Sequence, residues 1–84
     1  MTEVITVRYF AGARAATGMD QERLPVNRSW PLEELAGHLG ERHGPALQRV
    51  LAAASFLVDE TAGSRDRVVT AGSVVDVLPP FAGG

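Results

Sequence analysis

The chain of 84 residues contains no cysteine and no lysine. Without cysteine it has no disulfide, no thiolate metal ligand and no cysteine nucleophile, so any sulfur that it handles is not held on a cysteine side chain. All 8 basic residues are arginines, which leaves no side chain able to accept an isopeptide bond. These two absences exclude several kinds of covalent chemistry before any motif is considered.

The chain also lacks a basic stripe and a long apolar run. Its 8 basic and 10 acidic residues are spread along the sequence and give a net charge of −2, so we expect no nucleic-acid partner. No segment approaches the roughly 20 apolar residues of a membrane-spanning helix, and residues 1–3 do not resemble a secretion signal. We therefore expect a cytoplasmic protein with no membrane partner.

The length of the chain limits what it can do alone. A chain of this size buries only about 60% of its unfolded surface, which leaves no room for a second core or for a large substrate cavity. Catalysis by this chain alone is therefore disfavoured. A carrier, a binding module or a subunit of a larger complex is favoured instead.

The first segment has the alternation of a half-buried strand. Residues 3–10 place Ile5, Val7 and Tyr9 on one face, which we predict to be buried. Phe10 falls on the other face, together with the polar positions between the apolar ones. This segment is predicted to be the first strand of a sheet.

The last strand is predicted at 73–78. Its alternation turns Val75 and Val77 toward the core and Leu78 outward. Phe10 and Leu78 are therefore predicted to form an exposed apolar patch near the end of the chain. Shorter strands are predicted at 22–27, 55–59 and 67–69. Pro25 lacks an N–H for the ladder, which indicates that the first of them lies at a sheet edge or ends irregularly.

One firm helix is predicted at 30–42, because its apolar residues follow the spacing i, i+3, i+4 and i+7. The buried stripe consists of Leu32, Leu35, Ala36 and Leu39. Ser29 is a candidate N-cap, Pro31 fits the first turn, and Gly44-Pro45 ends the helix. A second short helix is predicted at 46–54 and one helical turn at 13–17. The order of elements predicts an α+β domain in which a mixed sheet of four to five strands packs on one main helix.

The two histidines are weak candidates for a site. His38 and His43 are five residues apart, which places them on different faces of a helix, and no carboxylate or cysteine completes a zinc set. We therefore predict that both are solvated helix residues and that the chain has no metal site.

The last strand runs directly into Pro79-Pro80-Phe81-Ala82-Gly83-Gly84. Two prolines favour an extended stalk, and two glycines give a slim tip that can enter a narrow channel. The carboxylate of Gly84 is then the most accessible acyl group of the chain. The alternative explanation is a frayed terminus with no role.

Three stretches of the chain resemble the small subunit of molybdopterin synthase, in the MoaD/ThiS family of ubiquitin-like sulfur carriers. The tail Val77-Leu-Pro-Pro-Phe-Ala-Gly-Gly84 is similar to the C-terminal signature of this family, although Phe81 stands where many members have valine. Tyr9-Phe-Ala-Gly-Ala-Arg-Ala-Ala-Thr-Gly18 and Leu32-Glu-Glu-Leu-Ala-Gly-His-Leu39 look like its first loop and its helix. The resemblance implies a β-grasp domain at 1–78 and a flexible tail at 79–84.

The resemblance also implies a function in molybdenum cofactor biosynthesis. An ATP-dependent, E1-like activating enzyme would adenylate the Gly84 carboxylate and convert it to a thiocarboxylate, with Gly83 supplying clearance. The large subunit of molybdopterin synthase would then use that sulfur on the pterin precursor. The chain itself would bind no cofactor and would be a non-catalytic sulfur donor in a heteromeric complex. The residues implied to dock on the partners are Phe10, Leu78, Pro79, Pro80, Phe81 and Ala82.

Two alternatives stay open. Related carriers serve thiazole synthesis, cysteine synthesis and protein tagging, and they share the fold and the Gly-Gly end. A ubiquitin-like interaction domain with an unreactive tail is the second alternative.

Overall fold

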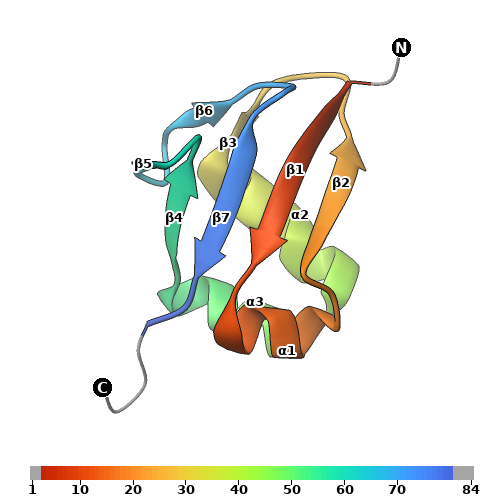
Figure 1. Cartoon of the computed structure of the whole chain (residues 1–84), viewed down its shortest axis with the longest axis vertical. Helices are drawn as coiled ribbons and strands as arrows, with labels where there is room; N and C mark the ends of the chain where they lie inside the picture. The colour runs from red at the N-terminus through yellow and green to blue at the C-terminus, as the bar shows by residue number, and fades with distance from the viewer. Residues whose placement is uncertain (1–2, 81–84) are drawn as a thin grey trace.

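The computed structural model describes residues 3–80, and its centre is a five-stranded mixed sheet (Figure 1). The strands lie in the order β2-β1-β7-β4-β5. The first and last strands of the chain pair in parallel, whereas the other neighbours are antiparallel. The strand bounds are β1 Val4–Tyr9, β2 Gln21–Pro25, β4 Ser55–Val58, β5 Thr61–Ala62 and β7 Val74–Leu78.

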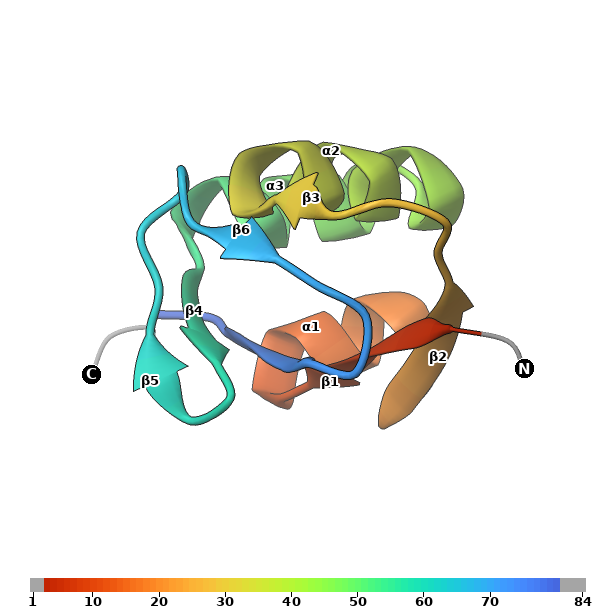
Figure 2. The ribbon, with the colours of Figure 1, turned by 90° about the horizontal axis from the view of Figure 1, so that it is seen from above.

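Three helices accompany the sheet: α1 Ala11–Thr17, α2 Leu32–His43 and α3 Pro45–Ala53. Figure 2 shows α2 and α3 above one face of the sheet, while no helix within residues 3–80 covers the opposite face. The short helix α1 lies beyond the ends of β1 and β7 (Figure 1). The predicted mixed sheet on one main helix is confirmed, with α3 as the expected second helix. Helix α1 is longer than the single turn predicted.

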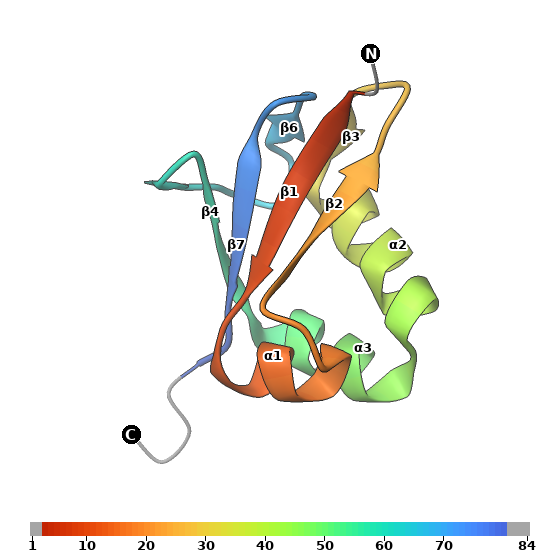
Figure 3. The ribbon, with the colours of Figure 1, turned by 45° about the vertical axis from the view of Figure 1, so that its right-hand side comes forward.

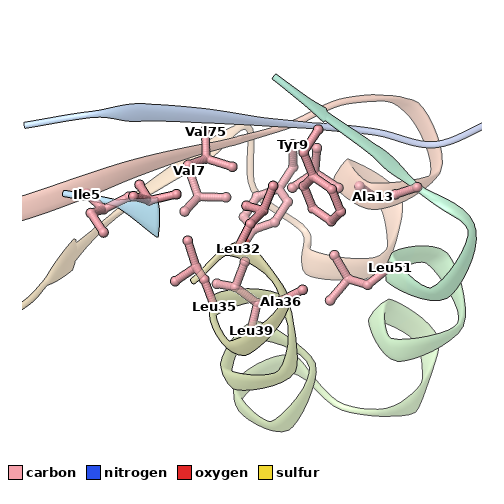
Figure 4. Packing of buried hydrophobic residues seen from close by; sticks show 14 of the residues in the cluster. Ile5, Val7, Tyr9, Ala13, Leu32, Leu35, Ala36, Leu39, Leu51 and Val75 are labelled. Atoms are coloured by element: carbon pink, nitrogen blue, oxygen red, sulfur yellow. The ribbon is translucent and has the colours of Figure 1, made fainter. Parts of the chain in front are cut away.

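The core lies between the sheet and the helices (Figure 4). The faces predicted from alternation are confirmed, because Ile5 and Val7 are fully buried and Tyr9 is nearly so. Val75 and Val77 of β7 are also fully buried. The predicted helical stripe faces them, and its four members are buried: Leu32, Leu35, Ala36 and Leu39. The hydrophobic free energy gained by burying this stripe stabilises the packing of α2 on the sheet.

The start of α2 differs from the prediction. Trp30–Pro31 forms the short strand β3, which pairs with β6 (Val68–Val69), and the helix begins at Leu32. Ser29 does not cap it: the N–H groups of Leu32 and Glu33 donate to backbone carbonyl oxygens of the 65–67 loop, each at 2.8 Å. A backbone segment distant in sequence thus satisfies the free amides that a side chain was expected to satisfy.

The two edges of the sheet are formed by β2 and by β5. Strand β2 lies at one edge, as predicted from Pro25. At the other edge, β4 and β5 are joined by Asp59 and Glu60, which have positive φ angles of 50° and 68°. A two-residue loop with both φ angles positive is the favoured hairpin connection, but its positions suit glycine or asparagine better than glutamate.

Candidate functional site: the root of the tail

The candidate site lies where β1 and β7 end side by side. The two strands are parallel, and Tyr9 is opposite Val77, so the next residues, Phe10 just after β1 and Leu78 at the end of β7, lie at the same end of the sheet. Figure 3 shows the ends of β1 and β7 at the same end of the sheet, where the chain continues beyond β7. Parallel pairing of the first and last strands therefore brings residues nearly 70 positions apart to the root of the tail.

The structure places the two apolar residues of the predicted patch on the face without helices. Each follows a buried residue, Tyr9 or Val77, and the alternation of a strand turns it to the other side. Phe10 is 40% exposed, which is unusual for a phenylalanine, and Leu78 is half-buried. The exposed ring and its neighbour form a surface that we call the Phe10/Leu78 surface; its use in docking stays a prediction.

An ion pair lies directly beside this surface and was missed in the sequence. Arg8 of β1 donates two hydrogen bonds to Asp76 of β7, one of them 2.8 Å from Nη2 to Oδ2. The side chain of Asp76 is only 6% exposed, against 41% for Arg8. The hydrogen bond to Asp76 and its charge raise the pKa of Arg8 above its ordinary value. The guanidinium carbon also lies 5.8 Å from the centroid of the Phe10 ring, within the range of a cation–π contact.

The predicted tail is described only at its root. Pro79 is half-buried and Pro80 is exposed, and neither belongs to a strand. The predicted site residues Phe81, Ala82, Gly83 and Gly84 lie outside the described residues. The division into a domain at 1–78 and a tail at 79–84 stays a prediction.

A second polar cluster joins β1, β2 and the end of α2 on the helix side of the sheet. The Tyr9 hydroxyl donates to Glu22 Oε1 at 2.8 Å, and His43 Nε2 bonds the same oxygen at 2.9 Å. Arg42 Nε donates to the other carboxylate oxygen at 3.4 Å. The prediction that His43 is solvated is wrong, because its side chain is 13% exposed and its ring packs edge-on against Tyr9 with centroids 5.7 Å apart.

The cluster shifts two pKa values. Burial, and then the hydrogen bond to Glu22, raises the pKa of Tyr9 well above its ordinary value, so the phenol stays a donor. Burial alone would raise the pKa of Glu22. The hydrogen bonds from His43 and Tyr9, together with the charges of His43 and Arg42, outweigh it and lower that pKa. The cluster links β1, β2 and the end of α2 by hydrogen bonds on the helix side of the sheet, whereas the Phe10/Leu78 surface lies on the face without helices.

His38 is exposed as predicted, and the centroid of its ring lies 5.2 Å from the centroid of the Trp30 ring. Within residues 3–80, no three side chains of the metal-ligating types are placed to hold an ion. No helix in the same part of the chain has the length and apolar character needed to cross a membrane.

The mixed sheet, with its parallel first and last strands and one main helix packed on one face, defines the ubiquitin-like β-grasp class of folds, and solved structures agree. Subunit 1 of a putative molybdopterin converting factor from Pyrococcus furiosus superimposes with a TM-score of 0.77 at 22% identity, covering 95% of this chain and 100% of that one. SAMP1 from Haloferax volcanii gives 0.80 at 22% identity, with 96% and 99% covered. At these identities the likeness establishes the fold, and it confirms the expected β-grasp architecture.

A third solved structure is a complex of subunits 1 and 2 of the molybdopterin-converting factor from Helicobacter pylori 26695. It matches with a TM-score of 0.66 at 22% identity, covering 96% of this chain and 99% of that one. Among curated proteins, none matches the chain significantly. The sequence model of the ThiS family matches residues 7–84. The chain therefore belongs to the ThiS family, a family of ubiquitin-like sulfur carriers.

Proposed function

We propose that the chain is the sulfur carrier of molybdenum cofactor biosynthesis and the small subunit of a molybdopterin synthase. The observation that carries this proposal is the family match, which extends through the Gly-Gly pair to residue 84. The likeness to subunit 1 of two molybdopterin converting factors supports the choice of pathway. The root of the tail supports it too, because Pro79 and Pro80 leave the sheet beside an exposed apolar surface.

The chemistry takes place on the Gly84 carboxylate. An activating enzyme that binds ATP joins a carboxylate oxygen to the α-phosphorus and releases pyrophosphate, which gives an acyl-adenylate. Sulfide delivered by a sulfur donor then attacks the acyl carbon, displaces AMP and leaves a terminal thiocarboxylate. That sulfur attacks an electrophilic carbon of the pterin precursor in the large subunit, and hydrolysis returns the carboxylate.

The residues of this chain present the tail rather than catalyse. Gly83 and Gly84 have no Cβ, so that the tip passes through a narrow channel. Pro79 and Pro80 restrict the backbone at the root of the tail. We propose that the Phe10/Leu78 surface docks on the partner, with Phe81 and Ala82 adding apolar contacts along the tail.

Deleting Gly84 tests the reactive terminus. The full chain and the shortened chain are incubated with the activating enzyme of the same organism, ATP and a sulfur donor, and their intact masses are recorded. We expect the full chain to gain the increment that replaces one oxygen by sulfur, and the C-terminal peptide to carry it. The shortened chain should unfold at the same denaturant concentration but gain no sulfur. An unmodified full chain beside an ATP-consuming enzyme would favour the unreactive interaction domain.

A carrier for another acceptor is the second candidate. The TM-score is 0.80 for SAMP1 and 0.77 for the Pyrococcus converting factor subunit. The two values are close, so the fold does not favour one pathway. Binding to the large subunit separates the two candidates. We expect the thiocarboxylated chain to be captured by the molybdopterin synthase large subunit and to convert the pterin precursor there. Thiocarboxylation without this binding would favour thiazole synthesis, cysteine synthesis or protein tagging.

A further inference from the structure

A groove lies at the root of the tail on the helix side. It has a volume of about 390 Å³, and its walls are the start of α1, the face of α3 that carries Arg49, Val50 and Ala53, and the Pro79–Pro80 pair. The Phe10/Leu78 surface lies on the face of the sheet without helices, because both residues follow buried ones, Tyr9 and Val77, in the alternation of their strands. The root of the tail is thus flanked by two different surfaces.

The lining of the groove is apolar except for one charge. Ala53 and the start of α1 are exposed and small, and Val50 and Pro79 are half-buried. Arg49 is exposed, and among residues 3–80 no carboxylate lies within 4 Å of it, whereas five of the other arginines each pair with one. An apolar hollow whose rim carries a cation with no carboxylate partner in residues 3–80 complements an apolar side chain that has a carboxylate beside it.

The groove adjoins the part of the chain that leads into the tail. Pro79 and Pro80 are both a wall of the groove and the stem that leads to residues 81–84. A protein that takes the tail into its own active site must cover the stem, and it then covers the groove as well. The unmodified chain is, under the proposed function, the substrate of the activating enzyme.

We propose that the groove receives an apolar side chain of the activating enzyme, with an adjacent carboxylate paired to Arg49. The enzyme then holds the stem from both sides, on the groove and on the Phe10/Leu78 surface. This inference rests on the proposed carrier function. It adds a binding surface on α3, far in sequence from the tail and from the first loop.

Two variants of the full-length chain test the groove, each with a matched control. Ala53→Trp fills the groove from an exposed position of α3, and Ala52→Trp places the same side chain one residue earlier, where it faces away from the groove. Arg49→Glu reverses the charge at the rim, and Arg23→Glu reverses an exposed arginine of β2. The rate of thiocarboxylation is measured by intact mass at several concentrations of each chain, and a urea midpoint shows that each variant is folded.

We expect Ala53→Trp and Arg49→Glu to raise KM about tenfold or more, with kcat within about twofold, which corresponds to about 1.4 kcal/mol of lost binding. Both controls should keep the wild-type KM. If the wild-type chain gains no sulfur, the proposed function is wrong and this inference falls with it. If the wild type is modified and both groove variants keep its KM, the inference alone is overturned.

Two other occupants have their own signatures. A second copy of the chain in the groove would appear as a wild-type dimer in sedimentation that Ala53→Trp dissociates. The chain's own tail in the groove would make Arg49→Glu a better substrate, with a lower KM, because the tail would be released. Either result overturns the assignment to the activating enzyme.

Discussion

Glu22 is the residue on which side chains from three other positions converge. Its side chain is 7% exposed and accepts hydrogen bonds from Tyr9, His43 and Arg42. A buried carboxylate is tolerated only when it is paired in this way. Sequence patterning indicated that Tyr9 is buried, but the polar partners on β2 and α2 depend on strand pairing and helix placement, so they were not predictable from local spacing.

The lowered pKa of Glu22 makes the stability of the fold depend on pH. Because the folded pKa is below the unfolded value of 4.5, the unfolded chain takes up a proton at a higher pH. The contribution is complete above pH 4.5 and is lost as the pH falls through the folded pKa. We expect Glu22→Gln to cost about 1–3 kcal/mol at pH 7 and to flatten the decline of stability in acid. Urea denaturation across this pH range measures both effects, with the exposed Glu41→Gln as control.

Glu60 has a backbone conformation that suits glycine. Its φ of 68° is in the left-handed region, and it follows Asp59, which is also left-handed. We expect Glu60→Gly to stabilise the protein by about 0.5–1 kcal/mol, measured by denaturant unfolding. Glu60→Ala removes the charge but keeps the Cβ, and it should give little gain. Equal gains from the two variants would assign the effect to the charge instead.

Asp59 provides a contrast to this substitution. Its carboxylate accepts the N–H of Val74 at 2.9 Å, and its own N–H donates to the Val74 carbonyl oxygen at 2.8 Å. These two bonds fix the hairpin to β7. We therefore expect no stabilisation from replacing Asp59.

At the scale of elements, the segments with a periodic apolar pattern were predictable, whereas the pairing of the two-residue strands β3 and β6 was not. The stripe on α2 and the alternation of β1 each extend over several positions, so tertiary context agrees with the local pattern. Strands β3 and β6 have two residues each, which is too short for any period. Strand β6 lies within the strand predicted at 67–69, but residues 30–31, which form its partner β3, were predicted to be helical. Pro31 was assigned to the first helical turn because it tolerates that position, but its place in β3 is set by pairing with Val68.

Helix α2 contains Gly37, which lowers helix stability at a position where packing does not require a glycine. Gly37 is exposed, and a Cβ built there meets no atom within 4 Å. We expect Gly37→Ala to stabilise the protein by about 0.5–1 kcal/mol, because alanine loses less backbone freedom on folding. A gain of this size raises Tm by about 2–8 °C in a domain of this length, as calorimetry would measure.

Gly40 of the same helix is the matched comparison. A Cβ there would lie 2.8 Å from Cγ of Gln48, whose amide donates to the Gly40 carbonyl oxygen at 3.1 Å. Gly40→Ala must move that side chain, so we expect a smaller gain or a loss. A larger gain at Gly40 than at Gly37 would contradict the packing argument.

For the whole molecule, the order of strands was the part that local patterns did not determine. Strand β7 pairs with β1 in parallel and with β4 in antiparallel, although β1 is 65 or more residues away in sequence. Nothing in the spacing of either strand specifies that partner, so the order was implied only by the family resemblance. The faces of both strands, by contrast, followed from alternation alone. The outward positions of Phe10 and Leu78 were therefore predictable, but the ion pair of Arg8 with Asp76 beside them was not, because it depends on the pairing of β1 with β7.

The core predicts where the folded unit ends. All buried apolar side chains in the described part of the chain lie between Ile5 and Val77. We expect a chain of residues 1–78 to keep its stability within about 1 kcal/mol, because Pro79 and Pro80 add little buried surface. Thermal unfolding of this chain and of the full chain measures the difference. A loss of several kcal/mol would show that residues 79–84 belong to the folded domain.

The central place of β7 also has a mechanical consequence. An enzyme that draws the chain beyond Pro80 into a channel applies its force along the axis of β7. That strand is held by β1 on one side and by β4 on the other. The load therefore acts in shear on two hydrogen-bond ladders together, whereas an edge strand such as β2 has a ladder on one side only. A carrier can thus be gripped by its tail, loaded and released many times while its domain stays folded.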